Sequence, residues 1–271
     1  MVQFAGHMNS KRPTNSLERA LEILELIACK SGGLTNAAIS NRMEMATSTA
    51  SYILNRLERS GFLQRQTETG RYEIGIKMVA LAHAPLRDMG LRREAEPVLR
   101  RLSGQTDASS LVGVLERGHV MIVDKIEKPD LSVIDMDIGV CYPVHSTALG
   151  KVLLAYLPEN RVHLIFDRVP FVKSSPRTIA SKSQLLEDLK RVKKQGYSVV
   201  DGELFMGIRA IAAPVFGASD EIRAAVSATG FTFSVEDKRI IGAVQAAAHE
   251  ISKRLAAAES GRTRAYPSVA K

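Results

Sequence analysis

The sequence lacks the features that define several classes of protein. Its two cysteines, Cys29 and Cys141, are far apart, so neither a disulfide framework nor a CxxC metal site can form. No apolar run approaches the ~18 residues that a membrane-spanning helix needs. The first residues also lack the basic start and the apolar stretch of a secretory signal. These absences predict a soluble, cytoplasmic protein in a reducing environment, with no membrane partner.

The motifs of common enzymes are missing as well. The six histidines show neither HxxxH nor HExxH spacing, and no Walker or dinucleotide-binding glycine pattern occurs. His145, Ser146 and Asp201 are the residue types of a nucleophile triad, but adjacent side chains point apart and no G-x-S-x-G elbow is present. We therefore predict no catalytic residue, no metal site and no cofactor.

The chain has enough length and apolar content for two folded domains. It contains 271 residues, of which 45% are hydrophobic and 24% charged. The 37 basic and 29 acidic residues give a net charge of +8. This charge suits a polyanionic partner, but a merely basic enzyme surface explains it equally well. Residues 1–14 are expected to be a flexible N-terminus, in which Met8 is a second possible start.

Residues 15–75 show three helical patterns followed by a hairpin pattern. Ser16, Thr35 and Thr47 are the expected caps of the three helices. Gly70 stands where a hairpin loop of this length needs a left-handed residue. This order predicts a winged helix-turn-helix, in which the third helix enters the major groove and the hairpin is the wing. A helical bundle that binds protein instead of DNA is the alternative that periodicity leaves open.

Small hydroxyl groups, rather than acidic residues, occupy the polar start of the third helix. This favours a surface that meets bases and phosphates. We expect Ser48, Thr49, Ser51 and Tyr52 to read bases. The full set of predicted DNA-binding residues is Thr35, Thr47, Ser48, Thr49, Ser51, Tyr52, Arg56, Arg65 and Arg71, in which the three arginines hold phosphates.

A linker helix is predicted over 76–96, where Pro85 should kink or restart it. Residues 97–258 then alternate between strand and helix patterns, which predicts an α+β domain with a largely antiparallel sheet. Residues 259–271 are predicted to be a disordered tail. The expected strands are 110–116, 119–126, 131–137, 197–200, 209–215 and 222–227, and the expected helices are 92–106, 145–157, 184–195 and 235–258.

The stretch PVHSTALGK predicts a helix start that can hold an anion. Ser146 or Thr147 is the expected cap, and the first-turn amides from Ala148 onward have no partner within the helix. Ser227 and Thr229 lie two apart on a strand and so share one side. The alternatives are an ordinary capped helix and a pair of half-buried strand residues.

A polar loop carrying Glu203 enters the buried strand that begins near Arg209. Amides and hydroxyls walled by Leu131, Ile134 and Ile208 suit a small organic acid. The alternative for Glu203 and Arg209 is a local salt bridge.

Several segments resemble the IclR family of bacterial transcription regulators. SLERALEILELIA, STASYILNRLERSGFL and RYEIG are similar to its DNA-binding half, and HSTALGKVLLAYL, GYSVVDGELFMGIRAIAAPVF and AAVSATG to its effector half. The resemblance implies an N-terminal winged helix-turn-helix, a linker helix and a GAF-like α/β effector-binding domain. It also implies homodimers or homotetramers on palindromic operators in double-stranded DNA, small carboxylate effectors from carbon catabolism, and repression as the commoner outcome.

The resemblance also implies a set of pocket residues. These are Ala148, Leu149, Ile208, Ala210, Ser227 and Thr229, with Leu131, Ile134 and Tyr142 in the apolar wall and Glu203 nearby.

The chain departs from the family pattern at a few positions. Ala210 stands where a cysteine is frequent, so a thiol contact to ligand is lost. Thr47, Ser51 and Tyr52 stand where Lys, His and Arg are frequent, which changes the expected phosphate affinity and operator sequence. We therefore predict a ligand-responsive DNA-binding transcriptional regulator. An enzyme acting on a small organic acid and a protein-interaction module with a degenerate winged helix are the alternatives.

Overall fold

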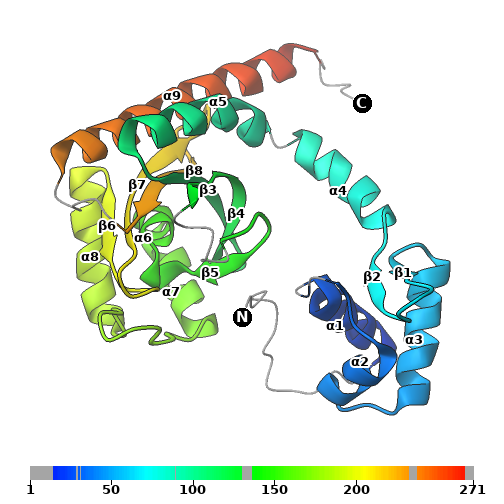
Figure 1. The fold of residues 1–271 in the computed structure, drawn as a ribbon. Helices are drawn as coiled ribbons and strands as arrows, with labels where there is room; N and C mark the ends of the chain where they lie inside the picture. Colours follow the sequence, from blue (N-terminus) through cyan, green and yellow to red (C-terminus); the bar gives the residue numbers. More distant parts are fainter. Residues whose placement is uncertain are drawn as a thin grey trace. The chain divides into compact units, whose positions relative to one another are not determined.

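The computed structural model describes residues 15–28, 30, 32–88, 90–129, 136–231 and 237–265. The chain divides into two compact units, an N-terminal unit over 1–88 and a C-terminal unit over 89–271, and each is described by itself (Figure 1). Among the residues so described, no helix is both long and apolar enough to cross a membrane.

The N-terminal unit contains the predicted three helices and hairpin. The elements are α1 (Ser16–Ala28), α2 (Asn36–Arg42), α3 (Thr47–Arg59), β1 (Leu63–Arg65) and β2 (Tyr72–Ile74), and the two strands pair antiparallel. Gly70 has the predicted positive φ, at 65°. The core of this unit is formed by Ile23, Ile27, Leu34, Ile39, Ala50, Ile53, Leu54, Leu63 and Tyr72.

Two of the three predicted helix caps are wrong. Thr35 caps α2 as expected, because its side chain accepts a hydrogen bond from the Ala38 amide. At α1 the acceptor is the side chain of Asn15, one residue before Ser16. At α3 the N-cap is Ala46, which has no side-chain cap, and Thr47 is the first helical residue. The first amides of α3 therefore keep their capacity to bind an anion.

Two helices follow, α4 (Lys77–Asp88) and α5 (Gly90–Thr106). The break between them lies after Asp88 and not at Pro85, and α5 begins early enough to place Pro97 inside the helix. A proline inside a helix costs about 3 kcal/mol. Burial of an apolar face that includes Leu91, Ala95, Leu99 and Leu102 offsets this cost and holds α5 together.

The C-terminal unit contains one antiparallel sheet, as predicted. Its spatial order is β5-β4-β3-β8-β7-β6, and every neighbouring pair is antiparallel. The predicted strand 131–137 falls mostly outside the described residues. The strands are β3 (Ser109–Glu116), β4 (His119–Ile126), β5 (Cys141–Pro143), β6 (Ser198–Asp201), β7 (Arg209–Phe216) and β8 (Ile222–Gly230).

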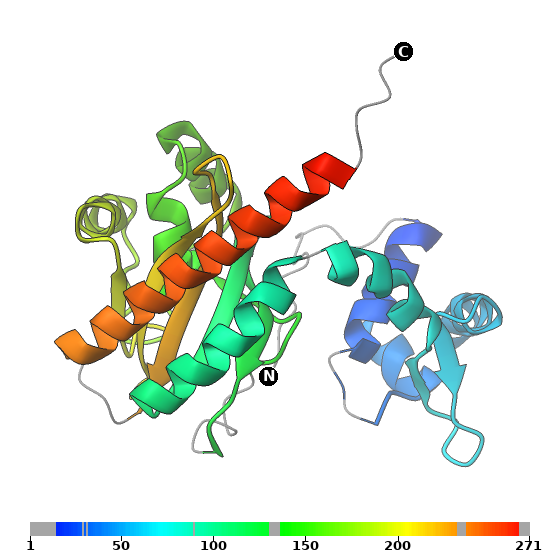
Figure 2. The ribbon, with the colours of Figure 1, turned by 90° about the horizontal axis from the view of Figure 1, so that it is seen from above.

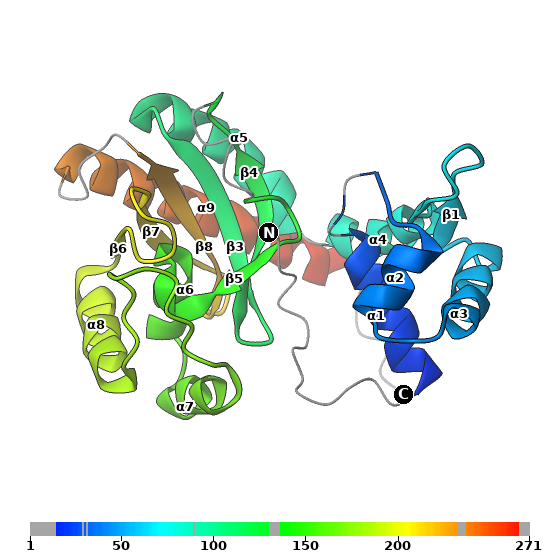
Figure 3. The ribbon, with the colours of Figure 1, turned by 60° about the horizontal axis from the view of Figure 1, so that its bottom comes forward.

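Helices cover both faces of this sheet. On one face α5 and α9 (Lys238–Ala265) lie side by side (Figure 2). On the other face lies α6 (Ala148–Ala155), with α8 (Lys182–Gln195) packed against it, while α7 (Glu159–Arg168) connects them in the chain (Figure 3). Because side chains alternate along β7 and β8, Ile211, Val226 and Ala228 enter the core beneath α5 and α9. Their neighbours Ala210, Ser227 and Thr229 consequently face α6.

Helix α9 extends to Ala265, into the stretch predicted as a disordered tail. The carboxylate of Glu259 accepts a hydrogen bond from the Ala218 amide at 2.9 Å and pairs with Arg223 at 2.8 Å. These contacts tie the helix to the β7–β8 connection, and sequence periodicity gives no sign of them. Residues 266–271 lie outside the described part of the chain.

Candidate functional site

Strand register places a row of side chains on the α6 face of the sheet. Val200 of β6 pairs with Ala210 of β7, which pairs with Thr229 of β8. At the other edge Val120 of β4 pairs with Tyr142 of β5. Residues directly opposite each other in an antiparallel sheet share a face. These five residues all line one cavity, of which the sheet is the floor.

The roof of the cavity is the start of α6. A short 3₁₀ turn, η2 (Val144–Ser146), leads into this helix, and of the two expected caps, Ser146 and Thr147, it is Thr147 that caps it. The Thr147 hydroxyl accepts from the Gly150 amide at 3.1 Å and donates to the Pro143 carbonyl at 3.2 Å. A Cβ on Gly150 would lie 2.2 Å from the Val144 carbonyl oxygen, so only glycine allows this close approach.

The cavity has an empty volume of about 470 Å³, counting the part open to solvent. Seven predicted effector residues line it, namely Tyr142, Ala148, Leu149, Ile208, Ala210, Ser227 and Thr229. Leu131 and Ile134 lie outside the described residues. Sequence reasoning missed Val120, Ile122, Met136, Val200, Leu204 and Phe205. The alternation along 119–126 could have found the first two, whereas the others depend on tertiary contacts.

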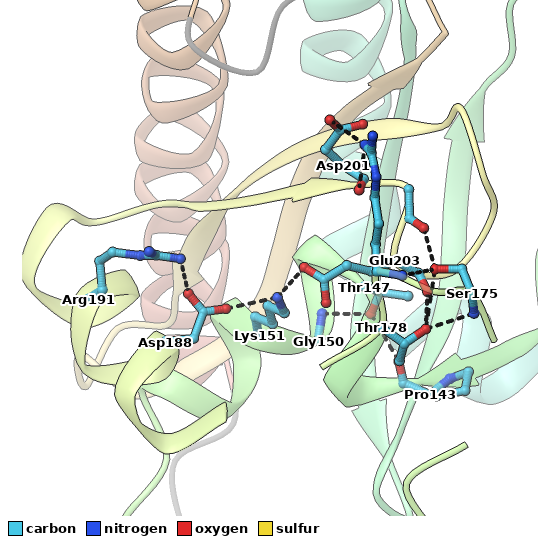
Figure 4. Close-up of polar contacts among 12 residues, drawn as sticks. Pro143, Thr147, Gly150, Lys151, Ser175, Thr178, Asp188, Arg191, Asp201 and Glu203 are labelled. Atoms are coloured by element: carbon cyan, nitrogen blue, oxygen red, sulfur yellow. Dashed lines mark hydrogen bonds and ion pairs between the residues drawn. The ribbon is translucent and has the colours of Figure 1, made fainter. Parts of the chain in front are cut away.

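Glu203 does not line the cavity. Its Oε1 lies 2.5 Å from Nζ of Lys151, a side chain that is 1% exposed (Figure 4). The same ammonium lies 2.8 Å from Oδ2 of Asp188, and Asp188 also pairs with Arg191. Burial raises the pKa of Glu203, against the lowering effect of Lys151. This buried cluster joins α6, α8 and the β6–β7 loop.

The β6–β7 loop is anchored at its start by two buried hydroxyls. Ser175 donates to the Gly202 carbonyl and Thr178 to the Glu203 carbonyl, both at 2.6 Å (Figure 4). The anchored loop carries Leu204 and Phe205 to the cavity. Glu203 and Arg209 each form a salt bridge, as the alternative interpretation expected, and the recorded partners are Lys151 and Asp201.

The acidic residue at the end of β6 is the partner of Arg209. Asp201 lies 3.4 Å from Arg209 and 2.8 Å from Arg177. Lys151, distant in sequence but buried beside the loop, is the partner of Glu203 because its ammonium has no access to water.

Few polar atoms reach the described part of the cavity. The Ser146 hydroxyl is fully buried, lines the cavity and has no hydrogen-bond partner in the described structure. The Ser227 and Thr229 hydroxyls lie 3.3 Å apart and hydrogen-bond to each other. His145 donates from Nε2 to the Val172 carbonyl at 3.0 Å, and burial lowers its pKa. This bond engages one of the two ring nitrogens of His145.

The N-terminal unit presents a second candidate site on the outer face of α3. Thr47, Ser48, Tyr52 and Arg56 are exposed, and Thr49 is half-buried. Tyr52 is 59% exposed, although it is a large aromatic side chain. The Arg56 guanidinium lies 5.4 Å from the centroid of its ring. A stacked cation and phenol at a helix surface can meet a phosphate and a base edge.

Three other predicted DNA-binding residues form hydrogen bonds within the N-terminal unit. Thr35 caps α2, and Ser51 accepts a 2.6 Å hydrogen bond from the side-chain amide of Asn36, which links α2 to α3. Arg71 donates to the Gly33 carbonyl at 3.0 Å. The Arg65 guanidinium lies over the Tyr72 ring, 5.5 Å from the ring centroid. The wing and the two helices are thus held in one arrangement by side chains of the same surface.

Within the described ranges, no group of three or more His, Cys, Asp or Glu side chains is placed to hold a metal ion. Cys141 is a half-buried free thiol whose pKa is raised by burial.

Comparisons with known proteins match both units. Residues 16–67 match the IclR helix-turn-helix domain, and residues 83–253 match the family described as bacterial transcriptional regulator IclR C-terminal. The chain is 31% identical over 225 residues to the HTH-type transcriptional regulator XynR of Escherichia coli K12, covering 83% of this chain and 89% of that protein. It is 29% identical over 227 residues to the transcriptional repressor IclR of the same organism, covering 83% of each.

A solved structure has the same fold. It is an IclR homologue from Microbacterium hydrocarbonoxydans complexed with 4-hydroxybenzoate, with a TM-score of 0.78 and 24% identity. The match covers 90% of this chain and 100% of that one, and the likeness shows the fold alone. The relatives matched by sequence are transcriptional regulators. From the two domain matches and these relatives, this chain belongs to the IclR family of bacterial transcriptional regulators.

Proposed function

We propose that the cavity of the C-terminal unit binds a small carboxylate from carbon catabolism, and that this binding changes the affinity of the N-terminal unit for an operator. The observation that carries the proposal is the cavity itself, which brings predicted effector residues from four separate segments together around a buried, unpartnered hydroxyl. Coupling between two such sites is typically ~1–3 kcal/mol. Repression is the outcome that the E. coli relative suggests. A regulator of bacterial genes acts in the cytoplasm, where the DNA lies.

For the DNA site, we propose that α3 enters the major groove of a palindromic operator. Ser48, Thr49 and Tyr52 meet base edges, while Arg56 and the wing residues Arg65 and Arg71 hold phosphates. The uncapped amides at the start of α3 suit one further phosphate. Thr35, Thr47 and Ser51 belong to the same surface, and Thr35 and Ser51 also fix its shape through the bonds described above.

The test is a titration of the purified protein with its own upstream DNA at two salt concentrations, with and without a panel of carboxylates. We expect specific binding that one acid changes by roughly 5–150-fold. Arg56→Ala and Arg65→Ala should each weaken binding to all sequences and reduce the salt slope by about 1, because each removes one phosphate contact.

Arg100→Ala is the matched control, since Arg100 is an exposed arginine that pairs with Glu96 on α5 of the C-terminal unit. It should leave affinity and slope unchanged. If the DNA affinity of Arg65→Ala depends on salt concentration as steeply as that of the parent protein, the wing does not touch DNA.

We further propose that the chain assembles as a homodimer or homotetramer through its N-terminal unit. Leu17 and Leu21 lie four residues apart on one face of α1 and are 68% and 53% exposed. Ile76, directly before α4, and Val79, in its first turn, are exposed as well. Burial of such exposed apolar side chains against a second copy of the chain would favour association.

The double variant Leu17→Glu, Leu21→Glu should lower the mass measured by analytical ultracentrifugation towards the 29.6 kDa of one chain. Two buried carboxylates without partners would oppose association. Leu164→Glu, at an exposed leucine on α7, serves as the control. A fall in mass for Leu164→Glu alone would place the interface on α7 instead.

A further inference from the structure

The described wall of the cavity carries no acidic or basic side chain. None of its described lining residues is an aspartate, glutamate, histidine, lysine or arginine. Aliphatic and aromatic groups dominate, including Val120, Ile122, Leu149, Leu204 and Phe205. A charged ligand group that enters this space therefore meets no counter-ion on a described lining side chain. Burying a charge without a partner is strongly unfavourable, so each charge on the ligand needs a specific site.

The nearest buried cation is already neutralised. Lys151 lies one turn along α6 from Ala148, but it does not line the cavity. Its ammonium lies 2.5 Å from the carboxylate of Glu203 and 2.8 Å from that of Asp188 (Figure 4). Two carboxylates surround one ammonium, so this cluster offers nothing to an additional ligand anion.

One end of the cavity can nevertheless hold a single carboxylate. The amides of Ala148 and Leu149 begin α6, where helix geometry provides no intrahelical acceptor, and both residues line the cavity. Beside them the Ser146 hydroxyl is fully buried and has no hydrogen-bond partner in the described structure. A buried hydroxyl without a partner in the protein is a donor for a ligand oxygen.

The remaining polar groups are few. The Ser227 and Thr229 hydroxyls hydrogen-bond to each other at 3.3 Å, so one of their two protons is used within the pair. They can serve about one further polar group of a ligand. A ligand with several hydroxyls would leave most of them unpaired against the apolar wall. The loss of their hydrogen bonds to water would strongly weaken its binding.

We infer that this chain's effector is a monocarboxylate whose other atoms are mainly apolar, such as an aryl or branched alkyl acid with at most one further polar group. Its carboxylate binds Ser146 and the first amides of α6, and its apolar part lies between the sheet and the β6–β7 loop. Dicarboxylates and sugar acids are disfavoured, because the described lining residues offer no counter-ion and few hydrogen-bond partners. The inference deepens the proposed function and rests on it for the regulatory role of the ligand.

Isothermal titration calorimetry of the full chain tests the ligand class, since the protein has no tryptophan to report binding by fluorescence. The probes are benzoate, 3-methylbutanoate, benzamide, phthalate and gluconate. We expect at least one monocarboxylate to bind tenfold or more tightly than benzamide, phthalate and gluconate. Equal or tighter binding of phthalate or gluconate would overturn the inference, and so would the absence of binding by both monocarboxylates.

Two serine variants test the carboxylate site. Ser146→Ala should weaken monocarboxylate binding tenfold or more, because it removes a hydrogen bond to a charged group. Ser198→Ala is the matched control, since Ser198 is also fully buried and its hydroxyl is also unpartnered, but it lies on β6 outside the cavity lining. Equal effects of the two changes would contradict the site. Ala210→Leu, which fills the floor, should abolish binding and covers the case in which Ser146→Ala does not fold.

The same ligands added to the operator titration separate the two proposals. A monocarboxylate that binds the protein without changing its affinity for DNA would support the ligand class and contradict the proposed function. Gluconate or phthalate that binds and changes the affinity for DNA would support the proposed function and contradict the inferred ligand class.

Discussion

Replacing Lys151 with methionine is expected to lower the free energy of unfolding of the C-terminal unit by about 3–5 kcal/mol. The ammonium is 1% exposed and lies between the carboxylates of Glu203 and Asp188. Methionine preserves most of the side-chain volume but leaves two buried carboxylates without their cation. Differential scanning calorimetry should show the loss as a large fall in the transition temperature of this unit.

The stability that Lys151→Met loses should depend on pH. Burial raises the pKa of Glu203, and Lys151 is the main group that lowers it, so removal of Lys151 raises this pKa further. A carboxyl whose folded pKa is raised favours the folded state below its unfolded pKa and loses that contribution as pH rises. The cost of Lys151→Met should therefore be smallest near pH 4–5 and largest at neutral pH.

Lys182→Met is the matched control for this change. Lys182 pairs with Asp167 at 2.8 Å, the same distance as Lys151 from Asp188, but both members of this pair are largely exposed. An exposed pair contributes at most about 1 kcal/mol. If the two variants lose similar stability, the buried cluster does not hold the β6–β7 loop against α6.

A second large effect is expected for Gly150→Ala, at the upper end of the ~1–3 kcal/mol that overpacking costs, or above it. The new Cβ would lie 2.2 Å from the Val144 carbonyl oxygen and 2.7 Å from the Thr147 hydroxyl. Backbone must move to relieve the first contact, which displaces the turn that carries Ser146 into α6. We expect calorimetry to show lower stability and titration to show loss of monocarboxylate binding.

The same substitution in α9 should have the opposite sign. Gly242 is exposed, and a Cβ built on it meets no atom within 4 Å. Alanine is favoured over glycine inside a helix by about 0.5–1 kcal/mol, so Gly242→Ala should stabilise the C-terminal unit by roughly that amount. Gly150 also lies in a helix, and the steric cost there has to exceed this gain. A stabilised Gly150→Ala variant would show that the η2–α6 turn can move freely.

The periodicity of apolar residues was enough to predict most helices and strands, but not the residues at which the helices begin and end. Hydrophobic periodicity located α1, α2, α3 and the hairpin, because each contributes a regular apolar face to the one core of the N-terminal unit. Caps were less predictable, since Asn15, Ser16, Ala46 and Thr47 are alternatives that differ by a single hydrogen bond. The last turns of α9 are held by the contact of Glu259 with Arg223, two residues far apart in the chain.

The effector site shows the same division. Sequence by itself determined that 143–151 starts a helix with free amides, that Ser227 and Thr229 share a strand face, and that family motifs run through both halves. Only the tertiary structure decided which side chains meet, because strand register brings Val200, Ala210 and Thr229 into one row. It also placed Glu203 beside Lys151, a residue far away in the chain, because a buried ammonium requires a carboxylate partner.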